Sequence, residues 1–405
     1  MRKSAETPPS FVLLLGLLAS LPGFGVDMAL PALANTAASI GIPTQSAGLT
    51  ISSYMVSFGI APLIYGPISD RRGRKPVVMF GCAVFIVAGL GCVLAQSLPM
   101  LLVCRVVQGV GAAAMTLAMA IARDSFDDSV LREKLSYIIV AIYLSPIAAP
   151  TAGAAVLALV GWRAIYASLV GLGLLVSIGV WFGLDEGSPS LPGRWRFLDV
   201  VSDYRRVLSH PVCRGYVAAG AASFGVVAAY TTGSSLFFIK AAGMSPSQFG
   251  IIFGVTALAS VAGALLDSRL AARGISSLRS LSIGLVVVTA ASTALLLMAV
   301  TGWTPIPIAV AMFMATTFGV GTMAPGVTQA ALQQMPQMAG TVSAVSNCVA
   351  MMAGSLSSAL AAEFFDGRTM LSVSSTMLLC ALAALIFFWM ATRSTIKQPI
   401  SQTEI

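Results

Sequence analysis

Two charged side chains lie far inside apolar segments of the sequence, where ionisable groups are rare and usually functional. Asp27 is the one acid well within such a segment, and Arg105 is the one base. A charge at the centre of a bilayer costs about 2.5–3.5 kcal/mol on the insertion scale, so it usually faces a cavity and has a partner. We therefore expect Asp27 to bind and release a proton. The alternative is a packing or capping aspartate near a membrane boundary, since Pro31 follows closely.

Arg105 is expected to lie at the same depth as Asp27. The two apolar segments that carry them, about 10–34 and 99–122, would run in opposite directions as the first and fourth helices. At 1.5 Å per residue both side chains lie roughly 10 Å below the same boundary. They are therefore predicted to share one cavity, in which the cation modulates the acidity of Asp27. A purely structural buried ion pair is the alternative.

The densest positive charge is at residues 66–76, which read Gly-Pro-Ile-Ser-Asp-Arg-Arg-Gly-Arg-Lys-Pro between two apolar runs. Four basic side chains cannot lie in lipid, so this segment is predicted to be a tight cytoplasmic turn by the positive-inside rule. Arg71, Arg72, Arg74 and Lys75 would also attract anionic lipid headgroups, by about 1 kcal/mol each. An ordinary basic loop between helices is the alternative.

Composition fixes the fold class. The chain is 57% hydrophobic and only 9% charged, whereas soluble proteins have about a quarter of their residues charged. Because a helical span needs about 20 apolar residues, 405 residues accommodate about twelve spans with short loops. We predict an all-α polytopic membrane protein with 12 transmembrane helices in two six-helix bundles. The basic residues lie mostly on one predicted side, with Arg163, Lys240 and Arg368 opposite; this sets topology, with both termini cytoplasmic, and is not a nucleic-acid footprint.

The domain organisation follows from one long polar interval. The expected domains are an N-terminal bundle at 1–184, a cytoplasmic linker at 185–212, and a C-terminal bundle with a short tail at 213–405. The spacing Gly66…Asp70-Arg71 returns as Gly263…Asp267-Ser268-Arg269, which indicates a repeat of the first half in the second. The first apolar run imitates a secretory leader, but we expect it to be an uncleaved span. The six scattered cysteines indicate neither a metal site nor disulfides.

Several motifs together resemble the major facilitator superfamily, and more narrowly its bicyclomycin/chloramphenicol-resistance (Bcr/CflA) drug:proton antiporters. Residues 66–76 look like the family's loop signature, motif A. Residues 27–33 are similar to the subgroup's first-helix pattern, with Ala29 where that family usually has Tyr. The other matches are 105–109 with Arg123-Asp124 (motif B), 146–154 (the antiporter motif C, with Ala149 and Ala154 where many antiporters have Gly), 161–163 and 338–341. The likeness covers nearly the whole chain.

The resemblance implies proton-coupled efflux of small amphipathic drugs or metabolites across a bacterial inner membrane by alternating access. The proton gradient is the energy source, without a cofactor or metal. Proton coupling is assigned to Asp27 and Arg105. Pro146, Pro150 and Gly153 would bend the fifth helix and so seal the pathway; ordinary packing of membrane helices is the alternative explanation of these residues. The expected gate includes a contact between Asp70 and Arg123, a latch that would hold the cytoplasmic side shut. The gating residues are Gly66, Asp70, Arg71, Gly73, Arg74, Arg123 and Asp124. Partners would be the small-molecule substrate, protons and membrane lipids, with no nucleic acid, and we expect a monomer.

The substrate cavity is predicted to have adaptable aromatic and thioether walls, which suit drug-like ligands. The candidates are Tyr54, Met55, Phe58, Met115, Met119, Tyr143, Phe224, Tyr230, Phe318, Met323 and Asn347. Uptake of a metabolite is the alternative transport function, and a scaffold without transport a further one. An enzyme is not expected, because His210 is the single histidine and the sequence has neither an H-E-x-x-H zinc motif nor a phosphate-binding G-x-x-x-x-G-K-[ST] loop.

Overall fold

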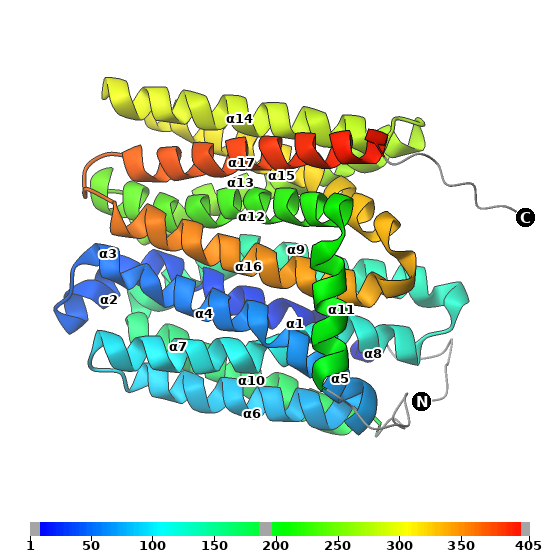
Figure 1. The fold of residues 1–405 in the computed structure, drawn as a ribbon. Coiled ribbons are helices and arrows are strands. Elements are labelled where there is room, and N and C mark those ends of the chain that lie inside the picture. The colour runs from blue at the N-terminus through cyan, green and yellow to red at the C-terminus, as the bar shows by residue number, and fades with distance from the viewer. Residues whose placement is uncertain (1–8, 186–196, 398–405) are drawn as a thin grey trace, which may run out of the picture. The chain divides into compact units, whose positions relative to one another are not determined.

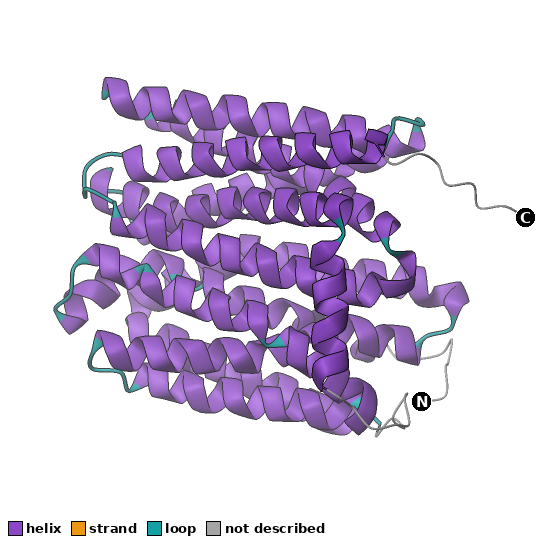
Figure 2. Cartoon of the chain, in the orientation of Figure 1, coloured by secondary structure: helices purple, strands orange, loops and turns teal. Residues whose placement is uncertain are grey.

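Every regular element in the part of the chain that the structure describes is a helix. The computed structural model describes residues 9–185 and 197–397, and Figure 2 shows helices joined by short loops. Within these ranges eleven helices are long and apolar enough to cross a membrane, or up to twelve if one bent pair counts as a single span. The predicted all-α, multi-span class is confirmed.

The bent pair ends in the basic segment at residues 66–76. Its two parts, Thr44–Ile60 and Pro62–Arg72, meet at an angle of 41°. Pro62 lacks a backbone N–H and its ring disturbs the preceding turn, so the helix breaks there.

The chain folds into two compact units. Unit 1 comprises Met1–Gly193, Thr231–Ala257 and Ala361–Thr369, and unit 2 comprises Arg194–Tyr230, Leu258–Leu360 and Met370–Ile405. Two segments from the second half of the sequence thus pack with the first half. The domain division at 184 and 212 stays a prediction, and residues 186–196 of the predicted linker lie outside the described residues.

Unit 1 contains the first ten helices and the ends of some later ones (Figure 1). Their bounds are α1 (Pro9–Asp27), η1 (Leu30–Ala32), α2 (Leu33–Ile40), α3 (Thr44–Ala47), α4 (Leu49–Ile60), α5 (Pro62–Arg72), α6 (Arg74–Val93), α7 (Leu98–Ala113), η2 (Ala114–Leu117), α8 (Ala118–Ser125), α9 (Asp128–Leu159) and α10 (Trp162–Gly183), joined by the π-helical η3 (Leu236–Ala241) and the start of α13 (Pro246–Ala272). The pairs α1–α9, α4–α7, α6–α7 and α6–α10 make its main helix contacts.

Unit 2 is built from the rest of α13, from Leu258 on, and from the remaining helices. Their bounds are α11 (Phe197–Ser209), α12 (Pro211–Ser235), α14 (Ser277–Thr301), α15 (Ile306–Gln334), η4 (Pro336–Met338), α16 (Ala339–Glu363) and α17 (Leu371–Lys397). Helix α14 packs against α15 and α17. The short α11 runs across the direction of α12 (Figure 1), and its Val207 is buried in a cluster with Val212, Tyr216 and Val345.

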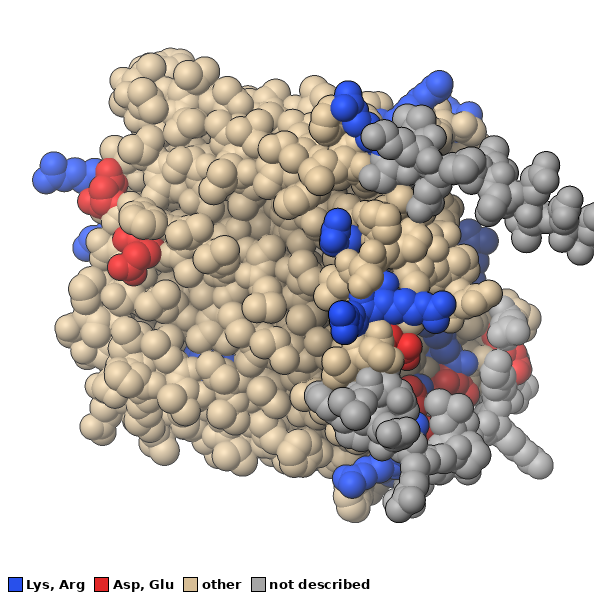
Figure 3. All heavy atoms as spheres, viewed as in Figure 1, with Lys and Arg blue, Asp and Glu red and all other residues tan. Residues whose placement is uncertain are grey.

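On the visible surface, charged side chains lie near the helix ends. On the face shown in Figure 3, the Lys and Arg side chains of each unit gather near the ends of its helices, and the broad middle carries almost no charge. Exposed side chains of the helices include Leu175, Ile178 and Phe182 on α10, and Leu297 on α14. Such a surface suits a hydrocarbon environment.

Small residues let the helices of unit 1 approach closely. A methyl group added to Gly111 of α7 would lie 2.4 Å from the backbone nitrogen of Phe85 on α6. One added to Gly153 of α9 would lie 2.2 Å from the carbonyl oxygen of Met28, directly after Asp27. Gly111 and the motif C residue Gly153 are therefore required by backbone contact, as is typical of membrane helix interfaces.

Neutral contacts join the two sequence halves inside unit 1. The Ser235 hydroxyl donates to the carbonyl oxygen of Leu30 at 2.5 Å, and the Gln45 amide donates to that of Phe365 at 3.1 Å. A methyl group on Gly48 would lie 2.4 Å from Cβ of Ala362. These contacts lie near the start of α4, at the opposite end of the bent span from Arg72.

Replacing Gly111 by alanine tests the close packing. We expect Gly111→Ala to lower the apparent melting temperature of the detergent-solubilised protein, because overpacking costs about 1–3 kcal/mol. Gly171→Ala on α10 is the control, since a methyl group there meets nothing within 4 Å and alanine is favoured over glycine in a helix by about 1 kcal/mol. Equal shifts for the two variants would contradict the packing argument.

Candidate functional site

Asp27 lies at a break in the first span. Helix α1 ends at Asp27, and a turn at Met28 and Ala29 leads into η1, where Pro31 prevents a regular helix from continuing. The Asp27 side chain is buried, with 8% exposure. Among the described residues no hydrogen bond or ion pair of its carboxylate is found. A buried acid at a helix break is chemically suited to exchange a proton.

Arg105 of α7 is completely buried and is held by neutral groups. Its Nε donates to the carbonyl oxygen of Thr50 at 3.2 Å, and its Nη1 donates to Oε1 of Gln108 at 2.7 Å. The guanidinium carbon lies 4.3 Å from the ring centre of Tyr54 and 5.7 Å from that of Tyr166. Cation–π contacts of this kind reach about 2 kcal/mol when desolvated. The aromatic faces supply part of the solvation that water would give.

Two donors in this cluster remain free within the described part of the chain. Nη2 of Arg105 and Nε2 of Gln108 are buried without a hydrogen-bond partner. Buried donors are nearly always paired. The two free N–H groups of the cluster can therefore donate hydrogen bonds to a further oxygen. A carboxylate, a water molecule or a ligand oxygen would satisfy these donors.

Tyr54 links the two charged residues. Its ring covers Arg105, and its hydroxyl donates to the carbonyl oxygen of Pro22 on α1 at 3.0 Å. It lies within electrostatic range of both Arg105 and Asp27. Among the described residues no direct Asp27–Arg105 contact is found, and Tyr54 is the side chain that lies near both. The shared cavity stays a prediction.

The loop cluster places Arg74 between two acids. Arg74 contacts Asp70 at 2.5 Å and Asp124 at 3.0 Å, and it donates to the Ser69 hydroxyl at 2.6 Å. Arg123 is exposed. Within the described residues, Arg74 makes the ion pairs at this turn, with Asp70 and Asp124, because it begins α6 beside the end of α8. The expected Asp70–Arg123 latch stays a prediction.

The glycines of the loop have different roles. Gly73 has φ 90° and ψ 157°, a conformation that favours glycine, and so it allows the turn from α5 to α6. A methyl group on Gly66 would meet nothing within 4 Å; its carbonyl accepts a hydrogen bond from Ser69. Arg71 is half-buried. The gating role of these residues stays a prediction.

Helix α9 carries the motif C residues against two neighbours. Both Pro146 and Pro150 lie inside the helix, and Gly153 contacts Met28 beside Asp27. Two residues earlier, on the other side of the helix, a methyl group on Gly250 of α13 would lie 3.2 Å from Cα of Thr151. The helix therefore connects the Asp27 break to the start of α13, all within unit 1.

The predicted cavity residues divide into three groups. Tyr54, Met55, Met115, Met323 and Tyr230 are buried, and Tyr230 packs on Phe313 at 5.0 Å between ring centres. Tyr143 is 44% exposed; Phe58, Met119 and Phe318 are half-buried. Phe224 and Asn347 line a cavity of about 340 Å³ inside unit 2, between α12, α15 and α16.

Several site residues were not predicted. Gln108 stands three residues after Arg105 on the same helix face, a spacing that could have identified it. Tyr166 and the Thr50 carbonyl come from other helices, and no local pattern points to them.

Arg74 can be tested by a double-mutant cycle. Arg74→Gln and Asp124→Asn, alone and together, should show a coupling of about 0.2–1 kcal/mol in equilibrium unfolding in mixed detergent and SDS, the range for partly exposed ion pairs. High salt should reduce the coupling, because the acids are 38% and 39% exposed. The cycle of Arg72→Gln with Asp124→Asn is the control, as Arg72 is exposed. Additive effects in both cycles would contradict the Arg74 assignment.

The sequence and fold match known transporters. The Major Facilitator Superfamily profile matches residues 14–359. A bicyclomycin resistance protein homolog of Haemophilus influenzae is 28% identical, covering 96% of this chain and 97% of its own. A chloramphenicol resistance protein of Pseudomonas aeruginosa is 29% identical, over 84% of this chain and 80% of its own, and multidrug resistance protein D of Escherichia coli is 28% identical, over 83% and 84%.

A solved structure shares the fold. The crystal structure of a bacterial homolog to the human lysosomal transporter Spinster superposes with a TM-score of 0.77 at 15% identity, covering 98% of this chain and 100% of that one. Since the profile spans most of the sequence, including the Asp27 and Arg105 clusters and the Arg74 loop, this multi-pass membrane protein belongs to the Major Facilitator Superfamily of transporters.

Proposed function

We propose that this transporter exports small amphipathic drugs or metabolites in exchange for protons, as a Bcr/CflA-type antiporter in a bacterial inner membrane. The observation that carries the proposal is Asp27, a buried acid at a helix break without an ion-pair partner among the described residues. The names of three relatives, which refer to bicyclomycin, chloramphenicol and multidrug resistance, support drugs as the transported compounds.

The proton and the drug would use Asp27 in alternation. A proton that binds Asp27 neutralises its charge and makes it less costly to hold away from water. The change of charge on Asp27 would act on Arg105 through Tyr54, whose ring packs on Arg105 and whose hydroxyl bonds to α1. Each proton that moves down a potential of 100 mV supplies about 2.3 kcal/mol, to which the pH gradient adds.

The ion-pair cluster of Asp70, Arg74 and Asp124 would be part of the inner gate. It lies at a turn rich in basic residues, which the positive-inside rule assigns to the cytoplasm. The same rule places both termini in the cytoplasm. Breaking and re-forming a partly exposed pair costs about 1 kcal/mol or less, which suits a contact that must open in every cycle.

Proteoliposomes test the proton coupling. With chloramphenicol added under a pH gradient, the wild-type protein should move protons, detected by an enclosed pH-sensitive dye, and accumulate the drug. Asp27→Asn should abolish drug accumulation driven by the gradient while leaving drug exchange without a gradient. Glu363→Gln, which removes an exposed acid, is the matched control and should behave as the wild type. If drug accumulation in Asp27→Asn still follows the pH gradient as in the wild type, the proposed proton site is wrong.

A further inference from the structure

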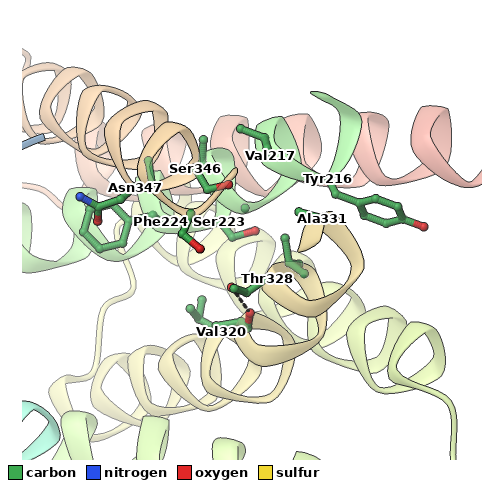
Figure 4. A pocket seen from close by; sticks show the side chains of 15 residues that line it. Tyr216, Val217, Ser223, Phe224, Val320, Thr328, Ala331, Ser346 and Asn347 are labelled. Atoms are coloured by element: carbon green, nitrogen blue, oxygen red, sulfur yellow. Dashed lines mark hydrogen bonds between the residues drawn. The ribbon is translucent and has the colours of Figure 1, made fainter. Parts of the chain in front are cut away.

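Unit 2 contains a cavity that is built without any residue of unit 1. Three helices form its walls: α12, α15 and α16 (Figure 4). Its volume of about 340 Å³ is within the range of small-molecule sites, about 300–1,000 Å³. The lining residues are Tyr216, Val217, Gly220, Ala221, Ser223 and Phe224 of α12, Val320, Ala324, Val327, Thr328 and Ala331 of α15, and Ser343, Ser346, Asn347 and Ala350 of α16.

No charged side chain is among these lining residues. A charged ligand would lose its hydration without gaining a counter-ion, which is costly in an apolar site. Most of the lining consists of Ala, Val, Gly and aromatic side chains, with a few hydroxyls and one amide. This composition selects an uncharged, largely apolar ligand group.

The hydroxyls of the cavity are not equivalent. Ser223 donates to the carbonyl oxygen of Ala219 at 2.7 Å, and Thr328 donates to that of Ala324 at 3.0 Å, so both donors are occupied. The Ser346 hydroxyl is different: its oxygen is buried and has no hydrogen-bond partner within the described residues. A buried hydroxyl without a partner is unfavourable, and a ligand acceptor would satisfy it.

The polar and aromatic side chains occupy different parts of the cavity. In Figure 4 Ser346 and Ser223 lie near the middle of the lining side chains, with Asn347 and Phe224 at one end and Tyr216 at the other. A planar ring beside Phe224 would therefore place a carbonyl substituent near Ser346. The Asn347 amide offers a second donor and an acceptor close by.

We infer that this cavity is a binding site for an uncharged aromatic group with a carbonyl or amide acceptor, which bonds to the Ser346 hydroxyl. The inference rests on the proposed function, since it names the class of compound carried. It also separates two tasks: the ligand group is held by unit 2, whereas Asp27 belongs to unit 1.

A pair of probes of equal shape tests the site. 2-Naphthamide is neutral and has a carbonyl acceptor, whereas 2-naphthamidine is a cation without one. In equilibrium dialysis against the purified full-length protein in detergent, with empty micelles subtracted, the amide should bind at least about tenfold more tightly. Ser346→Ala should weaken amide binding by about two- to tenfold, the effect of one hydrogen bond, and leave amidine binding unchanged.

Two further variants complete the test. Ala350→Leu should fill the cavity and reduce amide affinity further. Ser282→Ala, at a half-buried serine on α14 outside the cavity, should bind as the wild type. If Ala350→Leu does not fold, Ser346→Ala still decides. Absent amide binding, equal or tighter amidine binding, or amide affinity unchanged by Ser346→Ala would overturn the inference. Failure of the proposed export would show separately, as amide binding without proton movement through Asp27.

Discussion

A cation inside a membrane protein must be solvated by the protein alone, and Arg105 sets the arrangement around it. Two aromatic faces, one backbone carbonyl and one amide oxygen surround its guanidinium, and no acid contacts it among the described residues. These groups come from α4, α7 and α10, so holding the charge also holds three helices together. Tyr54 of α4 also bonds to the Pro22 carbonyl of α1, the helix that ends at Asp27. It thereby extends this arrangement to α1.

Backbone contact places a second constraint on Asp27. Because Gly153 lies directly against Met28, α9 cannot slide past the break in α1 without moving it. The other side of α9 approaches α13 at Thr151. A displacement of α13 relative to α9 is thus mechanically connected to the surroundings of the acid. Packed interfaces of this kind switch between discrete arrangements and do not deform continuously.

Most of the correct predictions came from residue types and from the distribution of apolar and basic residues along the chain. Apolar runs and basic loops located the spans, and the burial of Asp27 and Arg105 followed from their place inside those runs. The partners could not be predicted in the same way. Arg74 reaches Asp124 across 50 positions, and Tyr166 reaches Arg105 from another helix, so each pairing depends on tertiary packing. Likewise Met115 resembles a cavity wall by type but is buried in the core of unit 1.

The two ends of the bent span differ in the kind of contact they make. Near its start, Gln45 bonds to the Phe365 carbonyl and Gly48 packs against Ala362, without ionic groups. At its other end, Asp70 and Arg74 form an ion pair. Dissolved ions weaken ionic contacts and leave neutral ones nearly unchanged. Salt therefore weakens the contacts at the basic turn and leaves those at Gln45 and Gly48 nearly unchanged, so the two ends of one span differ in how they respond to ionic strength.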